Sequence, residues 1–327
     1  MKKIIFLAHD PGGSDVIAPV YKAFPTELYD KIFYAAGPAG DKYETYRKDK
    51  EDILRSLEAY LKQNELQCLV TGTSWADDTE IRSIAMCKSA QVVTVSVLDY
   101  WSNYAKRFLS TKSGEHIYPD FYFMMDDIAK KEAIADGVPE SIIKVVGHPG
   151  LDKYLLKNKS KDSKPKTRVL FLSQPLSVLY GKSLGFNEYD VMEDLMSICK
   201  ELSLPLSIKF HPKDSMDFKA KYQKLSINGD TDEAMLNSKI VVGMNTMALL
   251  YGALMGVSVI SYQPNLLQKD MCITNRLSIG KACFTKAELY DGLKNCGKSG
   301  ESVCEKLFQP ATENVVGEIM RIAQTER

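Results

Sequence analysis

The first polar loop of the chain follows a short apolar stretch near the N-terminus. It contains Asp10, Gly12, Gly13 and Ser14, and a helical pattern begins within it. Glycine lets the backbone approach a ligand closely, and the N-terminus of a following helix offers free N–H groups to an anion. The loop is therefore a candidate substrate-binding loop, and Asp10 is a candidate catalytic base. A tight turn without a ligand is the alternative.

A second polar loop follows the apolar stretch 68–71 and contains Thr73 and Ser74, whose hydroxyl groups are candidate substrate contacts. Asp77 and Asp78 come next, at the start of a predicted helix. At least one of these aspartates is expected to be the N-cap, because a carboxylate oxygen accepts hydrogen bonds from the first free N–H groups of a helix. Loops at the carboxyl ends of parallel strands share one edge of a sheet, so this loop and the first one are expected to face the same site.

Asp99 ends another apolar stretch and is followed directly by Tyr100 and Trp101. Burial beside aromatic rings raises the pKa of an acid by desolvation, which suits a general base. Asp99 is therefore the first candidate for the catalytic base. The alternative is a structural ion pair with Lys106 or Arg107.

Two histidine-proline pairs follow predicted strands, at His148 and at His211. The second pair is followed by Lys213, whose ammonium group suits a phosphate. A histidine at the carboxyl end of a strand is well placed for chemistry, so His211 is a candidate catalytic residue and Lys213 a candidate substrate-binding residue. For His148 the preferred interpretation is a turn.

The strongest local signal begins where an apolar strand ends at Gly243. Asn245 or Thr246 can cap the apolar helix that follows. The N-terminus of a buried helix leaves N–H groups pointing outward, which makes a suitable site for a pyrophosphate. Asn245 and Thr246 are therefore candidate substrate-binding residues, and a capped core helix without a ligand is the alternative.

The elements that must position these residues follow a regular alternation. Apolar stretches of strand type alternate with helical patterns, which is typical of βαβ units and parallel sheets. The predicted strands are 3–8, 31–35, 68–71, 91–97, 121–124, 143–146, 169–172, 206–210, 240–242 and 258–261. The predicted helices are 14–24, 49–64, 78–88, 126–136, 189–202, 232–237, 246–255, 286–296 and 311–322.

A chain of 327 residues, of which 45% are apolar, is long enough to form two hydrophobic cores. Residues 157–167 form a polar, basic stretch with little to bury, which indicates a linker. We therefore predict two Rossmann-like, doubly wound α/β domains with parallel sheets that face each other across a cleft. The first domain is expected to span 1–156 and the second 168–310.

Composition limits the classes of partner and location. Lys and Arg (42) balance Asp and Glu (42), so the chain lacks the overall positive field of a nucleic-acid-binding protein. The seven cysteines are scattered without a C-x-x-C pair, which is typical of reduced thiols and suggests neither disulfides nor a zinc site. No apolar stretch approaches the roughly 20 residues of a membrane span. A cytoplasmic location is expected, with the inner face of the membrane as an alternative.

The order of these motifs resembles the GT-B superfamily, and within it the UDP-N-acetylglucosamine 2-epimerase-like group and bacterial surface-polysaccharide glycosyltransferases. The resemblance spans nearly the whole chain, and the segments that carry it are 69–74, 121–156, His211-Pro212 and 243–264. It implies that the second domain holds the nucleotide, with the diphosphate against the helix that begins near Asn245. It adds Ser173, Gln174 and Met247 as substrate-binding residues. It also implies that a last helix, within 311–327, crosses back to the first domain.

Three positions separate the chain from the epimerases of that group. The epimerases have an acid where this chain reads Thr71-Gly72-Thr73, a Glu-Ala-Gly where it reads Asp99-Tyr100-Trp101, and a histidine loop where it reads Ser173-Gln174-Pro175. Epimerisation at the second carbon of a sugar needs several titrating groups. The sequence therefore favours a glycosyltransferase of cell-surface glycan synthesis. The alternatives are an NDP-sugar 2-epimerase or hydrolase and a noncatalytic nucleotide-sugar-binding relative.

The expected partners are a nucleotide-sugar donor and a glycan or small-molecule acceptor. No cofactor or metal is implied, because helix N–H groups and a basic side chain can stabilise a departing diphosphate. In this hypothesis Asp99 or Asp10 deprotonates the acceptor, while His211, Lys213 and the start of the helix near Asn245 hold the donor. The sequence leaves the oligomeric state open.

Overall fold

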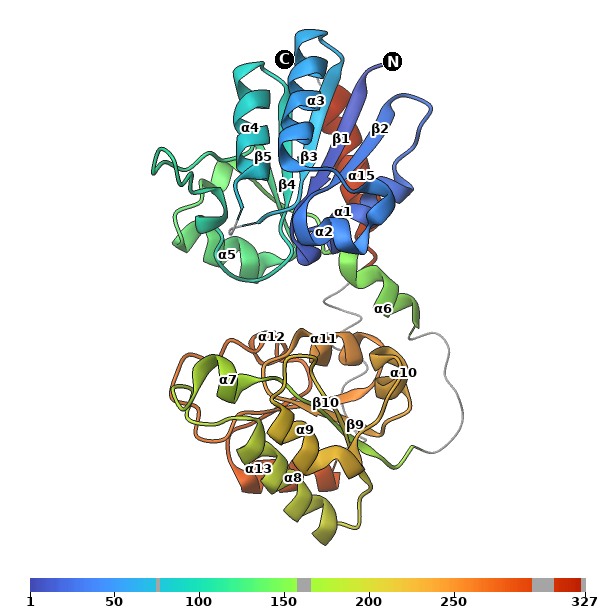
Figure 1. The fold of residues 1–327 in the computed structure, drawn as a ribbon, viewed down its shortest axis with the longest axis vertical. Helices are drawn as coiled ribbons and strands as arrows, with labels where there is room; N and C mark the ends of the chain where they lie inside the picture. The colour runs from blue at the N-terminus through green and yellow to red at the C-terminus, as the bar shows by residue number, and fades with distance from the viewer. Residues whose placement is uncertain (75–76, 158–165, 296–308, 325–327) are drawn as a thin grey trace. The chain divides into compact units, whose positions relative to one another are not determined.

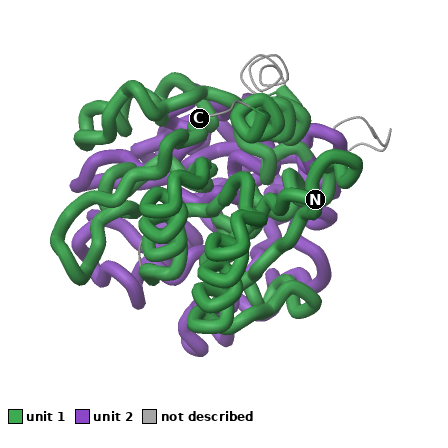
Figure 2. Tube along the Cα trace, turned by 90° about the horizontal axis from the view of Figure 1, so that it is seen from above, with its two compact units in different colours: residues 1–152, 309–327 green, residues 153–308 purple. Residues whose placement is uncertain are grey.

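The computed structural model of the chain describes residues 1–74, 77–157, 166–295 and 309–324 (Figure 1). The chain folds into two compact units, here called unit 1 and unit 2, which Figure 2 distinguishes by colour. Unit 1 comprises Met1–Asp152 and Gln309–Arg327, and unit 2 comprises Lys153–Phe308. Most of the predicted linker 157–167 lies outside the described residues, as do Cys296 and Cys304.

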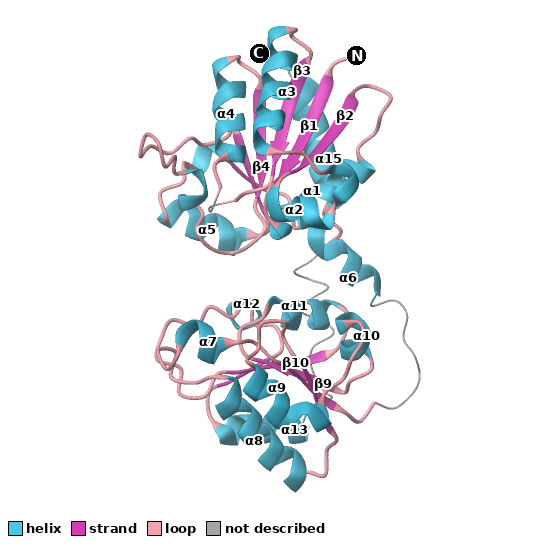
Figure 3. Cartoon of the chain, in the orientation of Figure 1, coloured by secondary structure: helices cyan, strands magenta, loops and turns pink. Residues whose placement is uncertain are grey.

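Unit 1 is built on a six-stranded parallel sheet in the order β2-β1-β3-β4-β5-β6. Figure 3 labels its strands β1 to β4. Its strands are β1 (Lys3–Ala8), β2 (Asp30–Ala35), β3 (Leu66–Thr71), β4 (Val93–Val97), β5 (Phe121–Met124) and β6 (Ile143–Val145). The inner strands are almost entirely buried, because helices that connect parallel strands cover both faces of the sheet.

Helices cover both faces of the unit 1 sheet. α1 (Pro11–Ala23) and the C-terminal α15 (Thr312–Gln324) pack together on one face, and α3 (Lys50–Lys62) and α4 (Thr79–Ser89) pack together on the other (Figure 1). α2 (Gly37–Lys42) follows β2, and α5 (Asp127–Ala135) joins β5 to β6. α15 belongs to this core because its apolar residues recur every three or four positions and form one buried stripe.

Unit 2 contains a five-stranded parallel sheet in the order β11-β10-β9-β7-β8. Its strands are β7 (Val169–Leu172), β8 (Leu206–Lys209), β9 (Ile240–Gly243), β10 (Ser258–Tyr262) and β11 (Lys281–Cys283). One core of this unit lies between the sheet and the helices α8 (Glu188–Glu201), α9 (Met216–Tyr222) and α13 (Lys286–Asn295).

The other face of the unit 2 sheet is covered by α11 (Met247–Leu254), which packs on β9 and β10 and contacts α10 (Thr231–Leu236) and α12 (Ile273–Arg276). Two further short helices are α6 (Asp152–Lys157) and α7 (Leu176–Tyr180). The ring of Tyr154 in α6 stacks on the ring of Tyr251 in α11, with 4.2 Å between their centroids. This contact fastens α6 to the α11 face.

The predicted fold class of two α/β units with parallel sheets is confirmed. Each predicted strand and helix is present, with ends that differ by a few residues, and the predicted end of the 286–296 helix falls outside the described residues. One difference affects the candidate site: α1 begins at Pro11 and not at residue 14, because the fixed φ of proline suits the first turn of a helix. Gly12, Gly13 and Ser14 therefore lie in the first turn of α1, whereas the sequence placed the two glycines in a loop.

The five cysteines among the described residues, Cys68, Cys87, Cys199, Cys272 and Cys283, are free and buried, as expected of reduced thiols. Burial raises the pKa of the Cys87 thiol to about 12, so this side chain behaves as an apolar group. Of the helices in the described part of the chain, none is both long enough and apolar enough to cross a membrane.

The start of α15 is fixed by Asp152. Its Oδ1 accepts a hydrogen bond from the N–H of Ala311 at 2.9 Å, and its Oδ2 accepts from the N–H of Thr312 at 2.8 Å and from the Thr312 hydroxyl at 2.6 Å. A carboxylate at this position satisfies free N–H groups and interacts favourably with the helix dipole. Gly147 packs against Ala311 from the other side, where a Cβ on Gly147 would lie only 2.5 Å from that of Ala311.

Replacement of this capping group should destabilise unit 1. Asp152→Ala is expected to lower the free energy of unfolding by about 1 kcal/mol, since loss of a side chain that caps a helix start costs roughly 0.5 to 2 kcal/mol. Urea denaturation would measure the change. Asp41→Ala removes an exposed ion pair with Arg47 and serves as the control, with little change expected. Equal stability of the two variants would contradict the capping role.

Candidate functional site

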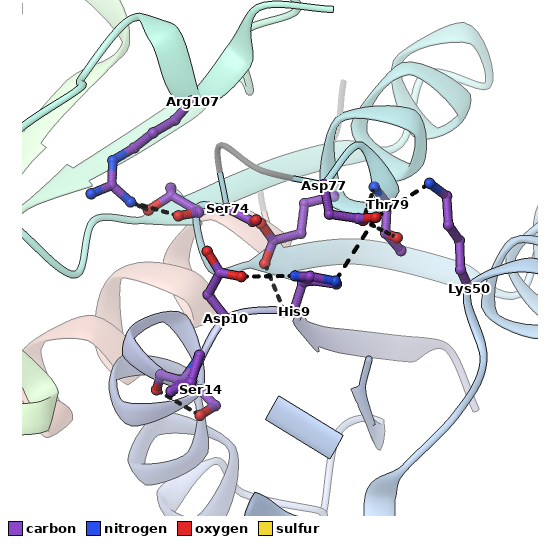
Figure 4. Close-up of polar contacts among 11 residues, drawn as sticks. His9, Asp10, Ser14, Lys50, Ser74, Asp77, Thr79 and Arg107 are labelled. Atoms are coloured by element: carbon purple, nitrogen blue, oxygen red, sulfur yellow. Dashed lines mark hydrogen bonds and ion pairs between the residues drawn. The ribbon is translucent and has the colours of Figure 1, made fainter. Parts of the chain in front are cut away.

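Charged and hydroxyl side chains gather at the carboxyl end of the unit 1 sheet. They follow β1, β3 and β4, whose ends lie side by side because β3 pairs with both of the other strands. We call them the unit 1 polar edge: His9, Asp10, Thr73, Ser74, Asp77, Glu80, Asp99 and Arg107. Figure 4 labels five of them, His9, Asp10, Ser74, Asp77 and Arg107. The structure thus brings together Asp10, Thr73, Ser74 and Asp99, which the sequence nominated separately.

His9 lies between two carboxylates of this edge. Its Nδ1 is 2.8 Å from Oδ1 of Asp10, and its Nε2 is 3.8 Å from Oδ2 of Asp77 (Figure 4). The hydrogen bond with Asp10 raises the pKa of His9, and the same hydrogen bond lowers the pKa of Asp10. The two side chains retain 16% and 28% of their exposure, so solvent or a ligand can reach the pair. A pair of this kind can take up and return a proton near neutral pH.

The two aspartates before α4 stabilise the start of that helix. Asp78 occupies the N-cap position, as predicted for at least one of the two aspartates, but its side chain accepts no capping hydrogen bond. Oδ1 of Asp77 accepts one instead, from the N–H of Thr79 at 2.7 Å. Lys50 of α3 forms ion pairs with both aspartates. Asp77 therefore has a structural role in addition to its position opposite His9.

Asp99 is held by an ion pair with Arg107, one of the two partners considered from the sequence. Its Oδ1 lies 2.7 Å from Nη1 of Arg107 and 3.3 Å from the hydroxyl of Thr73. The Arg107 side chain is only 5% exposed and also donates to the Thr73 carbonyl at 2.6 Å. The Asp99 carboxylate is therefore fixed in one orientation by a buried guanidinium group.

The first turn of α1 meets the same carboxylate. A Cβ on Gly12 would lie 2.0 Å from Oδ2 of Asp99, so the carboxylate lies directly over the N-terminal turn, where the helix dipole favours negative charge. The anion at this helix start is thus a side chain of the chain itself. Ser14 is fully buried and its hydroxyl donates to the Pro11 carbonyl at 2.7 Å, which uses the hydroxyl within the turn. Gly13 is also buried in this turn.

Glu80 is a buried carboxyl group of the unit 1 polar edge, with 2% exposure. Its Oε1 accepts a hydrogen bond from the N–H of His9 at 3.2 Å, and its Oε2 accepts from the N–H of Ser74. Burial raises the pKa of Glu80 to about 7, and the nearby charge of Asp10 acts in the same direction. Glu80 therefore exchanges its proton in the neutral pH range.

His148, also in unit 1, contacts the loop that carries Asp99. Its Nε2 lies 3.0 Å from the carbonyl oxygen of Asp99, and its ring stacks on the ring of Trp101. Burial lowers the pKa of His148, so the neutral ring is favoured. The histidine orients the backbone of Asp99, while Arg107 orients its side chain.

The carboxyl end of the unit 2 sheet carries the second set of candidates. β7 pairs with both β8 and β9, so the loops after these three strands are neighbours. We call this set the unit 2 polar edge: Ser173, Gln174, His211, Lys213, Asn245, Thr246 and Met247. The sequence nominated all seven, and the strand order places them at one end of the sheet.

Gln174 and Asn245 join two loops of this edge. Gln174 Nε2 donates to Oδ1 of Asn245 at 2.8 Å, and Gln174 Oε1 accepts from the N–H of Asn245 at 3.0 Å. Thr246 is the N-cap of α11, and its hydroxyl accepts from the N–H of Ala248 at 3.2 Å. The first turn of α11, which starts with the half-buried Met247, contains no acid. The first turn of α1 likewise contains no acid of its own, and the carboxylate over it belongs to Asp99.

His211 is oriented by its own loop. Its Nδ1 accepts a hydrogen bond from the N–H of Lys213 at 3.1 Å, which places the ring proton on Nε2. The N–H of His211 donates to Oδ2 of Asp214 at 2.8 Å, and this buried carboxylate fixes the loop. Lys213 is exposed and Ser173 is buried at the end of β7. His211 can thus donate a hydrogen bond through Nε2.

Sequence reasoning missed His9, Glu80 and the depth at which Arg107 is buried. His9 carried a usable signal, since it directly follows a strand in the same way as Asp99. Glu80 carried none, because an acid in the first turn of a helix is ordinarily an exposed partner of the helix dipole. Within the described ranges, no three side chains of the His, Cys, Asp or Glu type are arranged to hold a metal ion.

The fold is that of several solved enzymes of very different sequence. The chain superposes on UDP-GlcNAc 2-epimerase from Methanocaldococcus jannaschii with a TM-score of 0.70 at 11% identity, covering 98% of this chain and 99% of that one. For the UDP-GlcNAc 2-epimerase from Neisseria meningitidis bound to UDP-GlcNAc, the TM-score is 0.68 at 9% identity, with 98% and 99% covered. For MnaA of S. aureus with UDP, it is 0.66 at 13% identity, with 100% and 99% covered.

These similarities show that the chain shares the fold of these solved structures over nearly its full length. No protein-family model matches the sequence, and no curated protein sequence matches it significantly. Identities of this size carry no information on the reaction, because one fold hosts many activities.

A methyl group on Gly12 should displace the Asp99 carboxylate. Gly12→Ala is expected to lower the free energy of unfolding by roughly 1 to 3 kcal/mol, the usual cost of forcing an extra group into a packed site. Gly317→Ala is the matched control, because a Cβ there meets no atom within 4 Å and alanine favours a helix. Urea denaturation would compare the two. A Gly12→Ala protein as stable as the control would contradict the contact.

The buried carboxyl of Glu80 should make stability fall as pH rises. Between its ordinary pKa of 4.5 and its raised pKa of about 7, Glu80 keeps its proton in the folded state but loses it in the unfolded state. The unfolded state then binds fewer protons, so the contribution of Glu80 to the free energy of unfolding falls by up to about 1.4 kcal/mol per pH unit. Thermal unfolding of wild type and Glu80→Gln from pH 4.5 to 7.5 would measure this. Identical pH profiles would refute it.

Proposed function

We propose that the chain is an enzyme that acts on a nucleoside-diphosphate sugar, with a reaction of the 2-epimerase or hydrolase type. The proposal is carried by one observation: the unit 1 polar edge combines the His9–Asp10 pair with the carboxyl groups of Glu80 and Asp99. The epimerase-like fold and the UDP or UDP-GlcNAc bound in two of the similar structures support the substrate class.

The nucleotide is assigned to unit 2. A diphosphate needs N–H donors and positive charge, and the start of α11 offers a helix N-terminus whose first turn contains no acid. Asn245 presents its amide beside this turn, since Gln174 binds its Oδ1 and leaves its Nδ2 for other acceptors. The exposed Lys213 and Nε2 of His211 supply further donors. The start of α1 is less suitable, because the Asp99 carboxylate already lies there.

The proton transfer is assigned to unit 1. Removal of the proton at the second sugar carbon leaves an electron pair that forms a C1–C2 double bond and breaks the bond from C1 to the diphosphate oxygen. The departing nucleoside diphosphate carries away the electron pair of the C1–O bond, and a base of the enzyme keeps the proton. The His9–Asp10 pair can accept and return that proton, and the fixed Asp99 carboxylate stabilises positive charge that develops nearby. Epimerisation is completed when a proton adds to C2 on the other face and the diphosphate oxygen adds back to C1. Hydrolysis is completed when a proton adds to C2 and water adds to C1.

The arrangement of the acids favours an epimerase or hydrolase over a glycosyltransferase. The sequence alone favours a glycosyltransferase, because the acids of the epimerases are missing from their usual loops. The unit 1 polar edge supplies acids from other positions, Asp10 after β1 and Glu80 in α4, so the shortage of titrating groups that argued against an epimerase no longer holds. Transfer to a separate acceptor becomes the alternative that the first experiment tests.

The first experiment incubates the protein with UDP-N-acetylglucosamine, and with the corresponding CDP, GDP and dTDP sugars, in D₂O without any acceptor. The proposal expects deuterium at the second sugar carbon or release of the nucleoside diphosphate, both visible by NMR. Release that requires an added glycan acceptor would indicate a transferase instead. Binding without turnover, seen as a thermal shift with nucleotide sugars alone, would indicate a noncatalytic relative.

Removal of one carboxylate charge from the unit 1 polar edge should slow catalysis without weakening the binding of the nucleotide. Asp10→Asn and Asp99→Asn are each expected to lower kcat by roughly 100-fold or more, the usual loss for an acid or base, while the Kd for the nucleoside diphosphate stays within about twofold. Calorimetry measures binding and the D₂O assay measures turnover. Asp41→Asn, on an exposed surface, is the control. Full activity of Asp10→Asn would remove Asp10 from the proposed role.

A further inference from the structure

We propose that Glu80 is a positioning residue of the proposed site: with its two carboxyl oxygens it binds the backbone of His9 and of Ser74, and it thereby sets the geometry at which the His9–Asp10 pair works. The inference rests on the proposed function for the role of the pair. The clamp itself is a feature of the folded chain and can be tested without substrate.

The clamp joins the loop after β1 to the loop after β3. Oε1 accepts from the N–H of His9 in the loop after β1, and Oε2 accepts from the N–H of Ser74 in the loop after β3. The loop after β3 and the first turn of α1 both approach the carboxyl group closely, since a Cβ on Gly72 would lie 3.0 Å from Oε1 and one on Gly13 would lie 3.9 Å from it. A buried acceptor with two oxygens is therefore required at this point, because an unsatisfied buried N–H is costly.

The charge of Glu80 is coupled to that of the pair it holds. The charged groups that face it are Asp10, which favours the protonated form of Glu80, and His9, which favours the ionised form. Burial is the largest cause and raises the pKa of Glu80 to about 7. Near neutral pH Glu80 can therefore be protonated and uncharged, so that Asp10 has no second negative charge beside it.

The test uses the small number of histidines. The chain contains four, so ¹⁵N-labelled imidazoles can be followed one by one by NMR, with His9→Asn to assign the signal of His9. In Glu80→Gln the side chain has one accepting oxygen, and its NH₂ group faces the second N–H, so the clamp opens. The pKa of His9, raised in wild type first by the hydrogen bond with Asp10 and also by the charge of Glu80, is expected to fall towards its ordinary value of 6.5. In the D₂O assay kcat is expected to fall roughly 10- to 100-fold, with KM within about threefold.

Glu188→Gln is the matched control, because Glu188 is a fully buried glutamate of unit 2 that accepts from the N–H of Ser177 at 2.8 Å. It should leave the titration of His9 unchanged. A folded Glu80→Gln protein with wild-type titration of His9 and wild-type kcat would overturn the proposal. Hydrogen exchange of wild type needs no variant: rapid exchange of both the His9 and Ser74 amides would also overturn it. An altered His9 titration in a protein without turnover would retain the clamp and reject the proposed function.

Discussion

Charge compensation at the carboxyl end of a buried parallel sheet is the constraint on which the proposed site depends. A carboxylate removed from water is costly unless a cation or hydrogen-bond donors replace the lost solvation. Asp99 has the guanidinium of Arg107, Asp10 has His9, and Glu80 has two backbone N–H groups. Each compensating contact also fixes a position, so the groups that could react are held by the same interactions that make their burial tolerable.

The polar edges of the two units differ in chemistry although both sheets are parallel. In unit 1 the start of α1 meets the Asp99 carboxylate, and most other members of the edge are titrating groups. In unit 2 the edge consists mainly of amides, hydroxyls and donors, and α11 starts without an acid. The Asp99 carboxylate already compensates the helix dipole at the start of α1, which makes a second anion less favourable there.

The similarity to epimerases at about 10% identity has a physical explanation. The apolar strand pattern and the helical stripes preserve two cores under very different sequences, because burial depends on apolar character and volume more than on identity. The positions of the acids in the unit 1 polar edge are not set by apolar character or volume. They come from the loop after β1 and from α4, positions that a comparison of motifs in equivalent loops does not examine.

The sequence by itself determined the two α/β units, the strands and longer helices, and the loops that carry Asp10, Asp99 and Asn245, because apolar periodicity and capping residues act over short distances. The tertiary structure alone decided that α1 starts at Pro11, that Asp99 rather than a ligand lies over that helix, and that Glu80 is buried between two loops. These features depend on which strand lies beside which. Strand order follows from the packing of the whole core, so the residues of a single segment do not indicate which strands will lie beside it.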